Sequence, residues 1–282
     1  MGIAFLKGHG TQNDFVVLPD PDAELELTTE RVRALCDRRR GLGADGVLRV
    51  VRRAALGDTV PESAGEWFMD YRNADGSVAE MCGNGIRLFA RYLVRAGLVA
   101  GAAGEGTGEF VVGTRAGDRP VRVHPDGTVT VSMGPVRVTG ESMVSVGGLA
   151  LPGVAVDVGN PHLVCRVDTD IAELDLRQEP AYDARHFPRG VNLEFLNELG
   201  DESIRMRVHE RGVGETRACG TGTVAAAVVS LHAAGVWEGT RTVHVPGGTV
   251  TVTIGTTDAS LTGPAVLLAS GELDEGWWAS PA

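Results

Sequence analysis

A short phrase occurs twice in this chain, once in each half. Residues 82–85 read Cys-Gly-Asn-Gly and residues 219–222 read Cys-Gly-Thr-Gly, and a stretch of helix-forming residues follows each phrase. Each stretch ends at a glycine, Gly97 in the first copy and Gly235 in the second, where a left-handed cap is expected. We therefore predict one helix per copy, with the cysteine at its start, in a chain built from two similar domains.

Short runs of β-branched residues, separated by turn residues, make up most of the remaining sequence. Runs such as residues 120–123, 128–131 and 249–254 predict strands, and Asp-Gly and Gly-Gly pairs between runs predict hairpins. One further helix is predicted over residues 29–39. The sequence indicates an α+β fold of two pseudo-symmetric domains, each a largely antiparallel sheet wrapped around a central helix.

The length of 282 residues favours two domains of about 130 residues each. A valine-rich hairpin follows each helix, which suggests a duplicated unit. We predict an N-terminal domain over residues 1–132, rejoined by the C-terminal segment 264–282, and a C-terminal domain over residues 133–263. Exposed loops are expected at about residues 54–65 and 101–108.

The net charge of −11 argues against nucleic acid or an anionic membrane surface as a partner. No apolar run reaches the length of a membrane span, and the N-terminal segment lacks the apolar core of a signal peptide. Four widely spaced cysteines indicate reduced thiols in a reducing compartment. We expect a cytoplasmic protein that acts on a small molecule. The sequence leaves the oligomeric state open, with a homodimer as one candidate.

Cofactor motifs are absent or incomplete in the sequence. Residues 220–225 formally fit the dinucleotide pattern G-x-G-x-x-A, but polar residues 210–217 precede them where a strand is required. There is no phosphate loop, no spacing typical of a metal site and no lysine in a context typical of pyridoxal phosphate. We therefore predict no cofactor and no metal.

A cysteine at a helix start meets unpaired backbone N–H groups and the positive end of the helix dipole. Both favour a thiolate, and they also provide a seat for a carboxylate. If the two domains face each other, Cys82 and Cys219 can act as base and acid on opposite faces of one carbon. At about 7 Å and an effective dielectric of about 20, two thiolates would repel by roughly 2.4 kcal/mol. The working pair is therefore one thiolate and one thiol. Inert, buried cysteines are the structural alternative, which the repetition of the phrase disfavours.

Several blocks of the sequence resemble the diaminopimelate epimerases, in the same order along nearly the whole chain. These blocks are residues 13–16, 71–77, 81–85, 159–162, 191–192, 210–216 and 218–222. Enzymes of that family invert one α-carbon of a symmetric diamino diacid without a cofactor. The resemblance implies interconversion of LL- and meso-2,6-diaminopimelate, in the synthesis of lysine and of peptidoglycan precursors.

The resemblance also implies which residues form the site. Cys82 and Cys219 would be the acid–base pair. The reacting carboxylate would be held by the backbone amides of Gly83, Asn84, Gly220 and Thr221. The other groups of the substrate would be fixed by polar side chains, namely Asn13, Asn73, Asn160, Asn192, Glu210 and Arg211. Asparagine amides both donate and accept hydrogen bonds, and an arginine can hold a carboxylate with two parallel bonds.

Structural roles remain as alternatives for several of these positions. Asn73 could be a turn former and Glu210 with Arg211 a solvated surface pair. His162 is left open between binding and a loop histidine. Cys36 and Cys165 match no motif and are expected to be buried spectators.

Two positions depart from the pattern of the resembling family. Gln12 stands where many relatives have glycine, and Gly46 stands where some have glutamine. Neither change touches the thiols, so we expect effects on substrate contacts rather than on the reaction.

Two alternative functions remain open. One is a related racemase of the proline or histidine type, although proline racemases place a histidine where Asn84 stands and lack the Glu-Arg-Gly block at residues 210–212. The other is a binding protein or a redox switch, in which Cys82 and Cys219 form a reversible disulfide.

Overall fold

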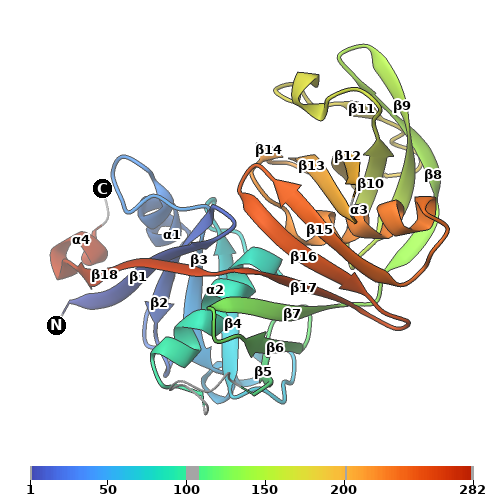
Figure 1. Ribbon diagram of the computed structural model, residues 1–282. Coiled ribbons are helices and arrows are strands. Elements are labelled where there is room, and N and C mark those ends of the chain that lie inside the picture. Colours follow the sequence, from blue (N-terminus) through green and yellow to red (C-terminus); the bar gives the residue numbers. More distant parts are fainter. Residues whose placement is uncertain (1, 100–107, 201, 281–282) are drawn as a thin grey trace. The chain divides into compact units, whose positions relative to one another are not determined.

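The computed structural model describes residues 2–99, 108–200 and 202–280 (Figure 1). The chain divides into two compact units. Unit 1 comprises Met1–Val131 and Pro264–Ala282, and unit 2 comprises Ser132–Gly263.

The described part of unit 1 contains a five-stranded sheet, three further antiparallel strands, three α-helices and one 3-10 helix. Its elements are β1 (Ile3–Gly10), β2 (Asn13–Pro19), α1 (Thr29–Cys36), β3 (Gly46–Arg52), the 3-10 helix η1 (Arg53–Thr59), β4 (Trp67–Asn73), α2 (Gly83–Arg95), β5 (Phe110–Val112), β6 (Arg119–Val123), β7 (Thr128–Gly134), β18 (Val266–Leu273) and α4 (Glu275–Ala279). The sheet order is β18-β1-β2-β3-β4, in which β2 and β3 run parallel and the other neighbours antiparallel. Strands β5, β6 and β7 pair in order.

The helix α2 is the centre of unit 1, and nearly all of its residues are buried. It packs against β1, β2 and β3 on one side and β6 on another (Figure 1). Successive residues of a strand face opposite sides of a sheet. Phe15 and Leu48 thus approach α2, while Val16 and Val47 join Leu35 of α1 in the core on the other face.

Unit 2 is one mostly antiparallel sheet around a second buried helix. Its elements are β8 (Arg137–Val146), β9 (Leu149–Asp157), β10 (Pro161–Arg166), the 3-10 helix η2 (Ile171–Glu173), β11 (Ala181–Tyr182), β12 (Asn192–Gly200), β13 (Ser203–Glu210), β14 (Gly214–Thr216), α3 (Gly220–Ala233), β15 (Gly239–Val245), β16 (Gly248–Ile254) and β17 (Ala259–Pro264). The strand order is β11-β8-β9-β10-β12-β13-β15-β16-β17, with β14 paired to β13. The pairs β10–β12 and β13–β15 are parallel.

The helix α3 is apolar on nearly all sides, as expected of a helix enclosed by protein. It packs against β9, β10, β12, β13, β15 and β16 (Figure 1). Each unit therefore wraps a mostly antiparallel sheet around one central helix, which confirms the predicted fold class.

The two central helices end in the same way. Gly97 and Gly235 adopt positive φ angles of 68° and 76°, and each begins the turn that leaves its helix. Leu98 N–H donates to Leu93 O at 2.9 Å after α2, and Val236 N–H makes the equivalent bond after α3 at 3.1 Å. These bonds form the Schellman cap that the glycines predicted.

The helix predicted over residues 29–39 is wrong at its C-terminal end, because α1 stops at Cys36. The Asp37 carboxylate accepts the backbone N–H groups of Arg39 and Arg40, both at 2.8 Å. An aspartate that binds the backbone two residues ahead favours a turn over a continuing helix.

The two expected loops differ in outcome. The segment 101–107 lies outside the described residues, and Gly108 is exposed coil. Residues 54–65 are largely exposed but include most of η1, which is kinked at Gly57.

The second glycine of the repeated phrase, Gly85 or Gly222, is packed differently in the two units. A Cβ on Gly222 would lie 2.6 Å from Glu194 Oε1, and Glu194 is fully buried and bonded to His162 at 2.7 Å. A Cβ on Gly85 would meet only side-chain atoms, the nearest at 3.3 Å. Only the α3 start is therefore closed to a larger residue.

We predict that Gly222→Ala lowers the free energy of unfolding by about 2 kcal/mol, because the added methyl collides with a carboxylate that cannot move away. Gly85→Ala should cost less than about 1 kcal/mol, since the higher helix propensity of alanine offsets a small steric cost. Urea unfolding of the two variants beside the parent chain measures both values. Equal losses would contradict this packing difference.

Candidate active site

Cys82 occupies the N-cap of α2, as the sequence predicts. Its backbone is extended, with φ −141° and ψ 121°, and its sulfur accepts the Gly85 N–H at 3.4 Å. Ile86 N–H closes the first turn on Cys82 O at 2.9 Å. The half-buried sulfur thus lies where the first N–H groups and the helix dipole favour negative charge.

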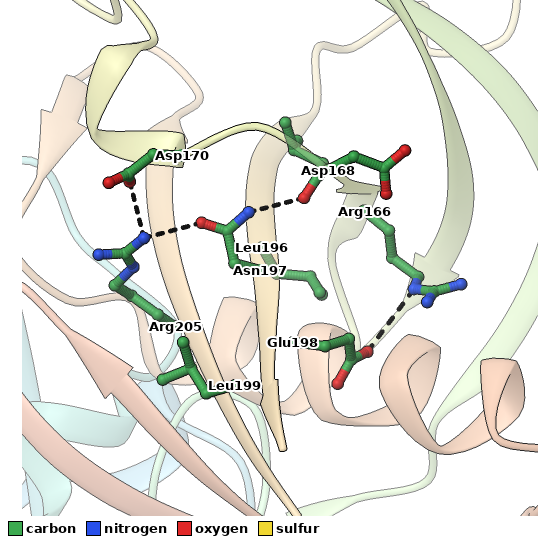
Figure 2. A pocket seen from close by; sticks show the side chains of 9 residues that line it. Arg166, Asp168, Asp170, Leu196, Asn197, Glu198, Leu199 and Arg205 are labelled. Carbon is green, nitrogen blue, oxygen red and sulfur yellow. Dashed lines mark hydrogen bonds and ion pairs between the residues drawn. The ribbon is translucent and has the colours of Figure 1, made fainter.

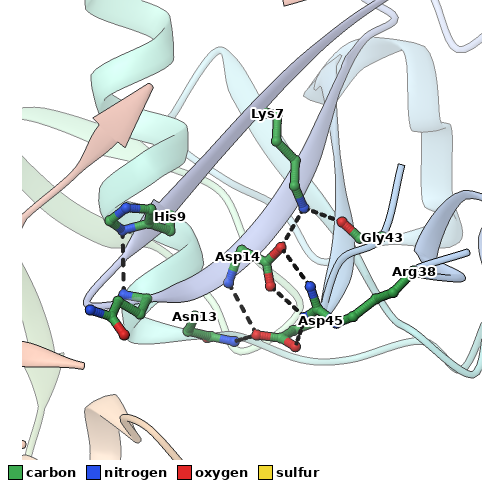
Figure 3. Close-up of polar contacts among 8 residues, drawn as sticks. Lys7, His9, Asn13, Asp14, Arg38, Gly43 and Asp45 are labelled. Carbon is green, nitrogen blue, oxygen red and sulfur yellow. Dashed lines mark hydrogen bonds and ion pairs between the residues drawn. The ribbon is translucent and has the colours of Figure 1, made fainter. Parts of the chain in front are cut away.

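Two asparagine side chains meet beside this sulfur. The Cys82 thiol donates to Asn13 Oδ1 at 3.5 Å, and Asn84 Nδ2 donates to the same oxygen at 3.2 Å. Asn13 Nδ2 in turn donates to Asp45 Oδ2 at 2.8 Å (Figure 3). Asp45 thereby turns the carbonyl of Asn13 toward the thiol. The structure brings together the predicted residues Asn13, Cys82 and Asn84, and it adds Asp45.

Asp45 belongs to a cluster of four charges in unit 1, shown in Figure 3. Lys7 pairs with Asp14, and Arg38 bridges Asp14 at 2.7 Å and Asp45 at 2.8 Å. Burial alone would raise the pKa of Asp14, but hydrogen bonds from Arg38 and Lys7 outweigh burial and lower this pKa overall. With two cations and two carboxylates, this cluster carries no net charge.

The two departures from the family pattern have local explanations. Gln12 has a φ of 61° in the turn between β1 and β2, a left-handed conformation that glycine adopts with less strain. A Cβ on Gly46 would lie 2.6 Å from Arg72 O, so the close pairing of β3 and β4 leaves no room for a side chain.

Asn73 lies across from Gly46 at the end of β4. Its Nδ2 donates to Ser77 Oγ at 3.0 Å, and its backbone closes the same turn. This is the turn-forming role that the sequence left as an alternative to binding. Among the described residues, these hydrogen bonds of Asn73 stay within the turn of residues 73–77.

Cys219 occupies the N-cap of α3 in the same geometry, with φ −123° and ψ 119°. Its sulfur accepts Gly222 N–H at 3.4 Å and lies 3.5 Å from Thr221 Oγ1. Burial, and then the negative charges of Glu210 and Glu194, raise the pKa of this thiol well above its ordinary value. Hydrogen bonds from Thr221 and Gly222 act in the opposite direction but are weaker.

A chain of hydrogen bonds leads from Cys219 to a buried acid. Asn160 Nδ2 donates to Thr221 Oγ1 at 3.4 Å, and Asn160 Oδ1 lies 3.0 Å from His162 Nε2. His162 Nδ1 lies 2.7 Å from Glu194 Oε1, and both side chains are fully buried. His162 is therefore a paired core histidine. Glu194 was not among the site residues predicted from the sequence. A carboxylate within an apolar strand was the signal that could have indicated it.

Asn192 and Arg211 lie together in unit 2. Arg211 N–H donates to Asn192 Oδ1 at 3.0 Å, and Asn192 Nδ2 donates to Pro161 O at 3.3 Å. Asn192 pairs with His162 in the parallel β10–β12 register, so Asn192 lies beside the hydrogen-bond chain to Cys219.

The neighbouring Glu210 accepts the Thr216 hydroxyl. The Arg211 side chain is exposed and donates to Arg189 O at 3.1 Å.

Cys36 and Cys165 are buried and not disulfide-bonded. Burial raises the pKa of each thiol to about 12. They remain protonated near neutral pH, in agreement with the spectator role expected of them.

A pocket of about 380 Å³ lies in unit 2 (Figure 2). It is lined by the C-terminal ends of β10 and β12, whereas His162 and Asn192 stand at the beginnings of the same strands. Its charged groups largely bind one another, as in the 2.7 Å pair of Arg205 with Asp170. The pocket therefore does not extend the candidate site.

Among the described residues, no group of three or more histidine, cysteine, aspartate or glutamate side chains could hold a metal ion. No helix in the described part of the chain is long and apolar enough to cross a membrane.

Solved structures with the same fold include two of low sequence identity. A phenazine biosynthesis protein of the PhzF family from Bacillus anthracis gives a TM-score of 0.69 at 16% identity, covering 97% of this chain and 99% of that protein. A hydroxyproline epimerase from Agrobacterium vitis gives a TM-score of 0.68 at 14% identity, covering 96% and 92%. At such identities the similarity concerns the fold alone.

Sequence relatives are much closer. The diaminopimelate epimerase of Rhodococcus jostii (strain RHA1) is 54% identical over 290 residues, covering 97% of this chain and 98% of the relative. That of Mycolicibacterium gilvum (strain PYR-GCK) is 55% identical over 291 residues, covering 98% and 99%. The family model for diaminopimelate epimerase matches residues 5–139 and 154–268. This chain belongs to the diaminopimelate epimerase family.

Proposed function

We propose that this chain is an isomerase that interconverts LL- and meso-2,6-diaminopimelate. The observation that carries the proposal is the pair of cysteine N-caps, Cys82 on α2 and Cys219 on α3, each in the same Cys-Gly-x-Gly phrase. Family membership supports the choice of substrate. The reaction supplies the meso isomer for the synthesis of lysine and of peptidoglycan precursors.

The proposed chemistry is a two-base proton transfer at one α-carbon. One thiolate removes the α-proton, and the electron pair of the broken C–H bond is delocalised into the adjacent carboxylate. The other thiol delivers its proton to the opposite face of the carbon. Cys82 and Cys219 are the two groups, and they exchange roles when the reaction runs backward. No redox partner and no cofactor is consumed, since one proton leaves and one arrives.

Negative charge builds on the reacting carboxylate during the transfer. We assign its binding to the backbone amides of Gly83 and Asn84 at the start of α2, and of Gly220 and Thr221 at the start of α3. The first N–H groups of a helix point outward along its axis and have no partner within the helix, so they stabilise an anion well. The N-cap geometry of both cysteines supports this assignment.

The unreacting end of the substrate carries an ammonium group and a second carboxylate. For these we propose a set of polar side chains, namely Asn13, Asn73, Asn160, Asn192, Glu210 and Arg211. The exposed Arg211 guanidinium suits the carboxylate, and the Glu210 carboxylate suits the ammonium group. The net charge of −11 supports a small-molecule substrate over nucleic acid or an anionic membrane surface. The four widely spaced cysteines support a cytoplasmic protein. We propose a homodimer as the assembly, which light scattering tests.

The first test measures proton exchange in D₂O. The parent chain should convert LL- to meso-diaminopimelate without added cofactor and place deuterium on the α-carbon. Cys82→Ala and Cys219→Ala should each lower the rate at least about 10³-fold, because a proton-transfer group is lost. Cys36→Ala is the matched control and should retain most of the activity. NMR follows both the isomers and the deuterium.

Two outcomes would contradict the proposal. Racemisation at the parent rate by either single cysteine variant would exclude the two-base mechanism. Exchange with proline or histidine but not with diaminopimelate, in the same assay, would favour the related racemases instead.

A second test concerns the distal carboxylate. Arg211→Lys should raise KM about tenfold and change kcat much less, because a lysine cannot form two parallel bonds to a carboxylate. Arg189→Lys serves as the control, since Arg189 contributes its backbone carbonyl to the Arg211 contact. An unchanged KM for Arg211→Lys would remove Arg211 from the substrate site.

A further inference from the structure

The helix α2 contains a fully buried guanidinium, that of Arg87. It donates to Pro264 O at 3.4 Å, Gly83 O at 3.2 Å, Thr11 Oγ1 at 3.0 Å and Asn84 Oδ1 at 3.0 Å. All four acceptors are neutral. Within residues 2–99, 108–200 and 202–280, Arg87 forms no ion pair with a carboxylate.

Burial of a cation without a carboxylate partner costs folding free energy. Burial lowers the pKa of Arg87 to about 10, so the group remains protonated near neutral pH. Its bonds to Gly83 O and Asn84 Oδ1 hold the guanidinium beside the first turn of α2. At this end of the helix, the dipole already favours an anion over a cation. Arg87 and the helix start therefore make one end of α2 strongly electropositive.

The other charged groups near Cys82 leave this charge unbalanced. Lys7, Arg38, Asp14 and Asp45 form the neutral cluster described above, in contact with the site through Asn13. Glu80, two residues before Cys82, is exposed to solvent. The Arg87 guanidinium is buried in the helix that begins at Cys82, and it interacts electrostatically with the Cys82 thiol.

The second copy of the phrase has the opposite electrostatics. Val224 stands where the first copy has Arg87, five residues after the cysteine, and it is fully buried. The charged and titratable groups around Cys219 include Glu210, Glu194 and His162, from β13, β12 and β10. Arg217, two residues before Cys219, is exposed and donates to Pro246 O at 2.8 Å. The Glu210 and Glu194 carboxylates oppose a thiolate at Cys219.

We propose that Arg87 is a positioning residue that makes Cys82 the more acidic of the two thiols, so that the free protein holds a Cys82 thiolate and a Cys219 thiol. Arg87 acts in two ways. Its positive charge stabilises the thiolate. Its bond to Asn84 Oδ1 also directs Asn84 Nδ2 to Asn13 Oδ1, where Asn84 competes with the Cys82 thiol for the same acceptor. The use of this polarity in turnover rests on the proposed function, but the polarity itself can be measured without substrate.

The experiment follows thiol alkylation against pH. The full chain is treated with iodoacetamide between pH 5 and pH 11, and peptide mass spectrometry gives a separate rate for each cysteine. Alkylation requires the thiolate, so each midpoint reports one thiol. In the parent chain the Cys82 midpoint should lie at least about one pH unit below that of Cys219. Cys36 and Cys165 provide unreactive references below about pH 9.

Variants of α2 then isolate the contribution of Arg87. Arg87→Met removes the charge, which destabilises the thiolate, and should raise the Cys82 midpoint by about one unit without moving that of Cys219. Arg87→Lys keeps the positive charge and should leave the Cys82 midpoint close to that of the parent chain. Arg95→Met removes a charge from the exposed last turn of the same helix and should move neither midpoint.

Two results would overturn the proposal. One is a Cys219 midpoint below that of Cys82 in the parent chain. The other is an unshifted Cys82 midpoint in an Arg87→Met protein whose circular dichroism matches the parent. If Arg87→Met does not fold, Arg87→Lys provides the second criterion. A Cys82 midpoint in Arg87→Lys that differs from the parent value by more than about one pH unit would then overturn the proposal. Absence of epimerase activity in the parent chain would reject the proposed function. It would not affect the proposal that Cys82 is the more acidic thiol.

Discussion

The bond from a helix N–H group to a cysteine sulfur is the interaction on which the candidate site depends. It occurs twice, from Gly85 to Cys82 and from Gly222 to Cys219, at 3.4 Å in both units. Each bond fixes a sulfur at the positive end of a helix that its own unit buries on nearly all sides. The surrounding sheet thereby holds the thiol in place, because neither helix can shift without disturbing a core.

Features encoded by neighbouring residues were predictable from the sequence. The helix starts, the glycine caps at Gly97 and Gly235 and the main hairpins follow from local rules of backbone geometry. The end of α1 was missed because a side chain, Asp37, competed for the backbone. Arg87 and Glu194 were missed for another reason: their importance arises from burial and from partners far away in the sequence.

The repeated phrase preserves backbone geometry while the charges around it differ. A helix start needs only an N-cap and small residues, so both copies keep the cysteine and the glycines. The side chains beneath the two helices are under no such constraint. Arg87 lies in the first helix, whereas Glu194 lies under the second, close enough to exclude a Cβ at Gly222. Two similar scaffolds therefore hold two chemically different thiols.

Each thiol is also subject to a contact that opposes the charge around it. At Cys82 the Asn13 carbonyl, oriented by Asp45, accepts the thiol proton and so favours the neutral form against Arg87. At Cys219 the bonds from Thr221 and Gly222 favour the thiolate against the carboxylates. A proton-transfer group works best when neither of its forms is strongly preferred at the working pH. These opposed contacts allow each sulfur both to lose a proton and to regain one.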